Sequence, residues 1–139
     1  MSVAWTRGQR QVIDYRGGNL LVSAAAGSGK TAVLVERIVE MITEKNHPVD
    51  IDHLLIMTFT NAAAAELRAR IGQALLHRSQ LQPGNAMLRR QRMLLQRAPI
   101  CTIDAFCLNL LHKYFQALDI PPDFAPADPG TCLLYTSPS

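Results

Sequence analysis

The stretch that most constrains the fold of this chain is residues 20–31, in which an apolar run leads into small residues and then into Gly-Lys-Thr. An apolar-periodic segment follows, so this order predicts a strand over residues 19–23, a tight loop and a helix. A loop that wraps a polyphosphate must bring its backbone N–H groups close to the phosphate oxygens, which excludes bulky side chains. A helix that begins at such a loop adds free N–H groups and the positive end of its dipole. The stretch is therefore typical of nucleotide binding.

The residues of this loop can be given roles from the pattern G-x-x-x-x-G-K-[ST]. Ala24 stands where the pattern has its first glycine, and the turn is possible there if the φ angle of Ala24 is negative. Lys30 is expected to reach the β- and γ-phosphates, and the Thr31 hydroxyl is expected to ligate Mg²⁺. The other residues expected to bind the nucleotide form the loop itself: Ala24, Ala25, Ala26, Gly27, Ser28 and Gly29. The alternative is an ordinary turn in which Lys-Thr follows a glycine by chance.

Length and composition limit the class of protein. A chain of 139 residues is one domain or less. No apolar run approaches the ~20 residues of a membrane span, and the N-terminal residues lack the apolar core of a signal peptide. The three cysteines, Cys101, Cys107 and Cys132, form no C-x-x-C pair, which fits a reducing compartment. These features together predict a cytoplasmic protein.

The net charge is only +3, but the charge is unevenly distributed. Between Asp52 and Asp104 the only acidic residue is Glu66, whereas arginine is frequent in the same interval. The arginines are Arg68, Arg70, Arg78, Arg89, Arg90, Arg92 and Arg97. Such a stretch favours a polyanionic partner; the alternatives are a solvated helix face or a face whose charges pair with acids elsewhere in the chain.

The remaining pattern alternates helices and strands. Thr6 is a good N-cap for a first helix that ends at Gly17 or Gly18. The apolar run over 54–59 reads as a strand buried on both faces, which would form a parallel βαβ unit with the strand over 19–23. Further helices are expected over 32–43, from Thr60 or Asn61 to about 81, over 86–97, and from Asp104 to about 118, with a short strand over 99–103. The fold class is therefore α/β, a parallel sheet flanked by helices.

Polar residues follow the second of these strands directly. Thr58, Thr60 and Asn61 offer hydroxyl, amide and free helix N–H groups at the carboxyl end of the strand, where open α/β sheets bind ligands. Phe59 offers a face on which a nucleic-acid base could stack. The alternatives are core packing for Phe59 and a simple N-cap for Asn61. Residues 102–107 repeat the arrangement, with Asp104 as the simplest N-cap of the helix that follows.

Taken together, these stretches resemble superfamily 1 DNA helicases of the UvrD/Rep type. Residues 5–9 look like the adenine-reading glutamine motif, 24–31 like motif I, 58–68 like motif Ia and 102–107 like motif Ib, in the same order and at similar spacing. Within the superfamily the chain is similar to the AddA (RexA) subunits of bacterial AddAB helicase–nucleases, over residues 16–37 and in the Ala-rich run after Asn61. UvrD-like members typically have Arg where Ala32 stands and Lys where Ala62 stands.

The resemblance implies a P-loop (RecA-like) fold and an ATP- and Mg²⁺-dependent motor that translocates on single-stranded DNA and unwinds duplex ends in double-strand break repair. It implies that Gln9 reads adenine, that Thr58, Phe59, Thr60, Asn61 and Thr102 contact DNA, and that an AddB/RexB-type subunit is the partner. Motif Ib usually has His-Ser or His-Gly where this chain has Asp104-Ala105, and a carboxylate beside DNA phosphates is unfavourable.

The resemblance also implies the domain organisation. Residues 1–118 correspond to the N-terminal part of motor domain 1A, 119–130 to the start of a connection or inserted domain, and 131–139 to a non-native tail. No strand ending in Asp-Glu follows residue 102, so the fragment alone is expected to be inactive. Three alternatives remain open: a UvrD/Rep/RecB-like helicase without a nuclease, a non-catalytic nucleotide- or DNA-binding module, and a small-molecule P-loop kinase.

Overall fold

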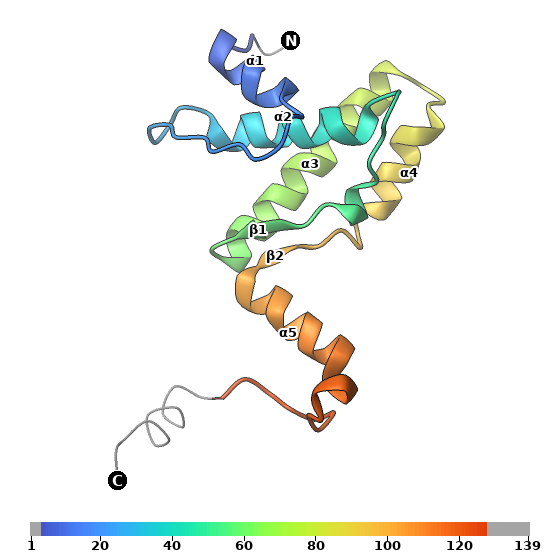
Figure 1. Cartoon of the computed structure of the whole chain (residues 1–139). Coiled ribbons are helices and arrows are strands. Elements are labelled where there is room, and N and C mark those ends of the chain that lie inside the picture. Colours follow the sequence, from blue (N-terminus) through green and yellow to red (C-terminus); the bar gives the residue numbers. More distant parts are fainter. Residues whose placement is uncertain (1–3, 128–139) are drawn as a thin grey trace. The chain divides into compact units, whose positions relative to one another are not determined.

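The computed structural model describes residues 4–127, which combine helices with one small parallel sheet (Figure 1). The chain divides into two units, with the boundary between Thr102 and Ile103. The first unit contains α1 (Arg7–Asp14), α2 (Lys30–Thr43), the 3₁₀ turn η1 (Ile51–His53), β1 (Ile56–Thr58), α3 (Asn61–Leu81), α4 (Ala86–Leu94) and β2 (Ile100–Thr102). The second contains α5 (Ile103–Tyr114) and the 3₁₀ turn η2 (Phe115–Leu118). The mixed α/β class predicted from the sequence is thus confirmed.

The core of the first unit lies where α2, α3 and α4 meet the sheet. On α3 the buried residues Leu67, Ile71 and Leu75 recur at the spacing of one helical face, as the apolar pattern predicts. On α2 the helical spacing of the apolar residues predicts a buried stripe that includes Leu34 and omits Val39, and this is partly wrong, because Leu34 is 41% exposed whereas Val39 is fully buried. The reason is that α2 is packed on two sides, against α1 and against α3, so its buried surface is wider than one stripe.

The two strands pair in parallel, with Ile56 opposite Ile100 and Thr58 opposite Thr102. The connection between them runs through α3 and α4, which is the helical crossover that parallel neighbours need. The prediction that the first of these strands is buried on both faces is wrong, because Met57 remains 44% exposed. Within the described residues α3 covers one face of the pair, so only the side chains on that face are buried.

Residues 19–23 do not form the predicted strand. They are irregular and exposed, and the side chain of Leu21 is 95% accessible. A strand takes its hydrogen bonds from a neighbouring strand, and in the described chain β1 and β2 pair only with each other. The βαβ unit expected between residues 19–23 and 54–59 is therefore also absent, and the parallel pair is formed by β1 and β2 instead.

Several predicted helix ends also need correction. α1 ends at Asp14 with Tyr15 in an extended conformation, and Gly18 reaches a φ of 125° only after the helix has ended. α4 ends at Leu94 rather than near Arg97. Asp104 lies inside the first turn of α5 and is not its N-cap. No residue of α5 is buried, although its apolar spacing is helical, because an amphipathic face is buried only when another element packs on it.

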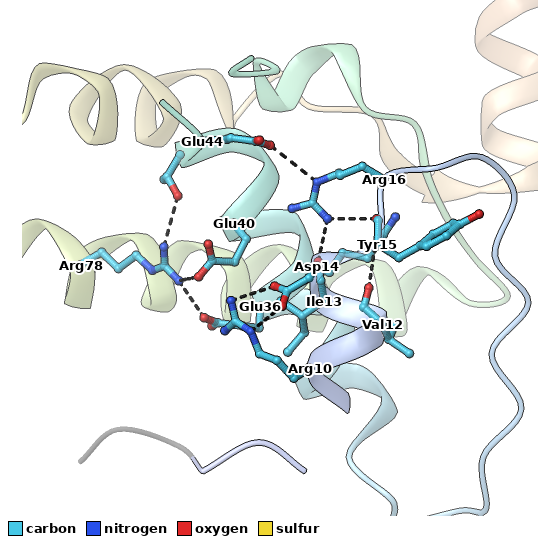
Figure 2. Close-up of polar contacts among 12 residues, drawn as sticks. Arg10, Val12, Ile13, Asp14, Tyr15, Arg16, Glu36, Glu40, Glu44 and Arg78 are labelled. Carbon is cyan, nitrogen blue, oxygen red and sulfur yellow. Dashed lines mark hydrogen bonds and ion pairs between the residues drawn. The ribbon is translucent and has the colours of Figure 1, made fainter. Parts of the chain in front are cut away.

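Ion pairs join the helices of the first unit, as Figure 2 shows. The Arg78 guanidinium on α3 donates to Glu36 Oε1 at 2.7 Å and to Glu40 Oε1 at 2.8 Å, both on α2. Arg16, after α1, approaches Glu44 at the end of α2. These contacts fix α2 between its neighbours, and the N-terminus of this helix carries the Gly-Lys-Thr sequence.

In the described part of the chain, no helix has both the length and the apolar character needed to cross a bilayer. The expected non-native tail at 131–139 lies outside the described residues.

Candidate functional site

Gln9 and the Gly-rich loop are brought together by the first helix. Thr6 and Gln9 form a capping box, in which Gln9 N donates to Thr6 Oγ1 at 3.3 Å and Thr6 N donates to Gln9 Oε1 at 2.9 Å. The Gln9 Nε2 group then donates to the backbone oxygen of Ser28 at 3.2 Å. A contact between residues 19 positions apart thus joins two stretches predicted separately from the sequence.

The loop before α2 has the backbone that a phosphate-binding turn requires. Gly27 and Gly29 adopt φ angles of 78° and 81°, where L side chains are strained. Asp119 is the only described non-glycine residue with a positive φ, so Ala24 satisfies the condition set by the missing first glycine. Gly29 is the N-cap of α2 and offers no side-chain bond, which leaves the first N–H groups of the helix available. The loop residues are all exposed.

Lys30 is the first residue of α2, and its ammonium group folds back over the loop. The Lys30 Nζ donates to Ala24 O at 2.6 Å and to Ala25 O at 3.2 Å. Thr31 follows in the same first turn and is exposed. The cation and the hydroxyl therefore lie at the helix N-terminus, where an anion is favoured by the helix dipole.

An open pocket of about 910 Å³ lies beside this loop. Its size is within the roughly 300–1,000 Å³ that small-ligand pockets span. Of the predicted nucleotide-binding residues, Gln9, Ala24, Ser28 and Lys30 line it, and the remaining loop residues and Thr31 do not. Apolar side chains of α1, α2 and the 19–23 segment complete the walls. The combination of an apolar wall with the Gln9 and Asn19 amides and the cations of Lys30 and Arg37 suits a molecule with a planar ring and an anionic end.

The residues predicted to contact DNA gather at one edge of the sheet. Thr58 and Thr102 are register partners at the carboxyl ends of their strands, and residues 59–61 follow directly. The Phe59 side chain is 98% exposed, which rules out core packing within this unit. Thr60 is the N-cap of α3, since its hydroxyl accepts from Ala63 N at 3.1 Å, and Asn61 is the first helical residue. The amide of Asn61 is therefore not used as a cap.

Comparison with known proteins assigns the family. A family model described as the UvrD/REP helicase N-terminal domain matches residues 5–135. The chain belongs to this UvrD/REP family. The match covers the Gln9 helix, the Gly-rich loop and the carboxyl ends of both strands, which agrees with the resemblance found in the sequence.

Curated relatives share this part of the family. The chain is 53% identical over 134 residues to an ATP-dependent helicase/nuclease subunit of Lachnoclostridium phytofermentans, covering 96% of this chain and 10% of that protein. Proteins of the same name from Desulforamulus reducens and Clostridium novyi are 57% and 55% identical, covering 89% and 91% of this chain and 10% of each relative. The chain thus spans about a tenth of the length of these relatives.

Most arginines of the arginine-rich stretch in this UvrD-type chain are bonded to partners inside the unit. Arg68 donates to the backbone oxygens of Leu95, of Ala98 at 2.9 Å and of Ile100 at 3.4 Å. Four further arginines pair with carboxylates: Arg70, Arg78, Arg90 and Arg97. Within residues 4–127, the members of this stretch that make neither kind of contact are Arg89 and Arg92. The alternative of pairing with acids elsewhere in the chain is therefore the better account of the basic run.

Two polar residues with structural roles were not singled out from the sequence. Gln91 is buried on α4, where its Oε1 accepts from Ile51 N at 2.9 Å and its Nε2 donates to Asp50 Oδ1 at 2.6 Å. Arg90 also binds Asp50, and this guanidinium lowers the pKa of the Asp50 carboxyl to about 2. The signal for Gln91 was its position three residues after Leu88, on the apolar face of a helix. The other residue is Arg37, which bonds to the backbone of α1.

Proposed function

We propose that this chain is the N-terminal, nucleotide-binding part of an ATP-dependent DNA helicase and exonuclease subunit. The complete protein would translocate on single-stranded DNA and unwind duplex ends in double-strand break repair and recombination. One observation carries the proposal: in a UvrD/REP-family chain, the Gln9 amide and the Lys30 ammonium lie on one pocket beside a loop of small residues. The relatives are named ATP-dependent helicase/nuclease subunits, which supports helicase and nuclease activities in the complete protein.

The pocket chemistry favours ATP. The Lys30 ammonium binds two neutral carbonyls, and phosphate oxygens would replace them because hydrogen bonds between ionised groups are stronger. The Gln9 amide carries one acceptor and a donor, which match the adenine N6 amino group and N7. Guanine presents acceptors at both O6 and N7, so it would leave the Gln9 oxygen unpaired. The same residues thereby favour ATP over GTP.

The donor set near Lys30 fits magnesium only in part. Thr31 places an exposed hydroxyl in the first turn of α2, and Mg²⁺ prefers oxygen ligands. No described residue that lines the pocket is an Asp or Glu, so Thr31 would supply one ligand and the phosphates others. When bound, Mg²⁺ neutralises charge that develops on the phosphates. The contribution of this chain is to hold the phosphates between Lys30, the loop N–H groups and Thr31.

The sheet edge is proposed as the path of single-stranded DNA. Phe59 offers an exposed ring to a base, while polar groups lie around it on Thr58, Thr60, Asn61 and Thr102. Stacking on aromatic rings is tolerant of sequence, as a motor that moves along any strand requires. The nucleotide site and this edge belong to the same unit, which allows nucleotide binding to influence DNA contacts.

In the complete protein this chain would be part of a larger sheet, a motor domain and a two-subunit enzyme. A P-loop (RecA-like) sheet would form when strands from the rest of the protein pair with residues 19–23, whose apolar side chains are exposed in this chain. Residues 1–118 would form the first part of motor domain 1A, and residues 119–130 would lead into the next segment. The relatives are named as one subunit of their enzyme, which supports a second subunit that we propose is of the AddB/RexB type.

The test is Lys30→Ala in the full-length subunit with its partner, with Lys45→Ala as a control on an exposed lysine of the turn after α2. We expect Lys30→Ala to abolish ATP hydrolysis and DNA unwinding, because the Lys30 ammonium is the cation that bonds directly to the loop, at Ala24 O and Ala25 O. Lys45→Ala should behave as the unaltered protein. ATP turnover that is unchanged in Lys30→Ala would contradict the proposal.

A further inference from the structure

Arg37 binds the carboxyl end of the helix that carries Gln9. The last four carbonyls of a helix lack partners within it, and α1 is only 8 residues long. The Arg37 Nη1 group donates to Val12 O at 2.5 Å and to Tyr15 O at 2.6 Å. Figure 2 labels Val12 and Tyr15 beside the ion pairs of α2. Arg37 thus satisfies the carbonyl of Val12 in the last turn of α1, and it shares the carbonyl of Tyr15, just after the helix, with Arg16, whose Nη1 donates to that oxygen at 3.1 Å.

The same arginine stands on the helix that begins with Lys30. Arg37 follows Lys30 by seven residues, which is close to two turns, so both side chains lie on one side of α2. Lys30, Arg37, Gln9 and Val12 all line the candidate nucleotide pocket. The packing of α1 on α2, with Ile13 fully buried, supports the contact. The guanidinium therefore fixes the spacing between the Gln9 helix and the Lys30 helix.

The surroundings of Arg37 disfavour its positive charge. Partial burial lowers the pKa of Arg37, and the positive charge of Arg16 lowers it further. In the described part of the chain Arg37 has no carboxylate partner, and the bonds it makes go to the backbone of α1. A surface arginine that serves only solubility would be neither partly buried nor bonded to the backbone of another element. The observation points to a role in holding α1 in one position.

We propose that Arg37 is a positioning residue for base recognition, which holds Gln9 at the distance from Lys30 that an adenine nucleotide spans. This inference rests on the proposed ATP site and adds the device that sets its selectivity. If Arg37 only stabilised the fold, its loss would affect ATP and GTP equally. If Arg37 acts through Gln9, its loss weakens ATP alone, because GTP does not use the Gln9 amide fully.

The experiment measures kcat and KM for ATP and for GTP in the full-length subunit with its partner. The variants are Arg37→Met, which keeps the apolar stem and removes the donors, Arg37→Lys, which keeps a cation, Gln9→Ala, and the double variant Gln9→Ala with Arg37→Met. Arg10→Met is the matched control, because Arg10 lies on α1 but bonds Asp14 of the same helix. Thermal unfolding of each variant accompanies the kinetics.

We expect Arg37→Met to raise KM for ATP about tenfold. The kcat for either nucleotide, and KM for GTP, should stay within about twofold of the values for the unaltered protein. Arg37→Lys should restore part of the preference for ATP, and Arg10→Met should keep it. In the Gln9→Ala background, Arg37→Met should add no further loss of selectivity, because both residues act on the same contact.

Three results would overturn the inference: equal rises of KM for ATP and GTP, no change in selectivity, or additive effects of the Gln9 and Arg37 variants. If Arg37→Met fails to fold, Arg37→Lys carries the same comparison. A failure of the proposed function is separately visible, since it appears as ATP hydrolysis that survives Lys30→Ala. Selectivity that depends on Gln9 but not on Arg37 would refute this inference alone.

Discussion

Replacement of Phe59 by alanine separates a DNA-stacking role from a packing role. The Phe59 ring is 98% exposed, so its removal costs almost no buried apolar area in this unit. Base stacking on an aromatic side chain contributes roughly 1–3 kcal/mol by alanine substitution. We therefore expect Phe59→Ala to weaken single-stranded DNA binding by about fivefold to roughly 150-fold. The unfolding free energy should change by less than about 0.5 kcal/mol.

The measurement uses the full-length subunit with its partner. Fluorescence anisotropy of labelled single-stranded DNA, at one fixed salt concentration, gives the affinity, and ATP hydrolysis is followed with and without DNA. Met93→Ala is the control, since Met93 is another exposed apolar side chain, on α4 and away from the sheet edge. DNA-stimulated hydrolysis should fall in Phe59→Ala while basal hydrolysis is kept.

The stacking argument is refuted if Phe59→Ala binds DNA as tightly as the Met93→Ala control. It is also refuted if basal and stimulated hydrolysis fall equally and the melting temperature drops, because that pattern indicates that Phe59 is packed against another part of the complete protein.

Two further predictions concern contacts inside the unit and are measured by hydrogen–deuterium exchange in the full-length protein. Arg68→Met leaves the carbonyls of Ala98 and Ile100 without their donor, so the opening free energy of residues 95–101 should fall by about 2 kcal/mol. The control Arg70→Met, at an exposed ion pair, should change this free energy by less than about 0.5 kcal/mol. Equal effects of the two variants would contradict the role of Arg68. The pKa of Asp50 is lowered to about 2 from an ordinary value of 3.8, so its stabilising contribution is present above pH 4 and lost as the pH falls toward 2. Protection near Ile51, corrected for intrinsic exchange, should therefore differ between the unaltered protein and Asp50→Asn at pH 5 and converge near pH 2, and a difference independent of pH would contradict it.

Local signals were sufficient to predict much of the backbone conformation around the candidate nucleotide site. The capping of α1 by Thr6 and Gln9 depends on residues three positions apart, and the turn before α2 depends on Gly27 and Gly29 themselves. The same holds for the start of α3 at Thr60. Each of these features is decided within one turn of helix or loop, so the sequence pattern and the structure agree.

Contacts between distant residues could not be predicted in the same way. Arg68 lies off the apolar stripe of α3 and was placed in a basic run, but its guanidinium binds carbonyls 27 to 32 residues further along the chain. Arg37 is similar, since it reaches back 25 residues to Val12. A charged residue on a helix has the same local pattern whether it faces water or the backbone of a neighbouring element. Only the packing of α2, α3 and α4 distinguishes the two.

The segment at 19–23 shows why a loop with the backbone expected of a phosphate-binding turn can occur beside a strand that is not formed. The loop is stabilised by bonds within itself, from Ser28 N to Ala25 O and from Lys30 Nζ to Ala24 O, and by the Gln9 contact to Ser28. A strand has no such local source, because each of its N–H and C=O groups needs a neighbouring strand. The apolar run therefore predicts a strand only where a neighbouring strand is present, and because no described strand pairs with residues 19–23, the side chain of Leu21 is exposed. The loop can thus hold its shape without a strand at residues 19–23, whereas the pocket wall formed by Leu20 and Val22 depends on how that segment packs.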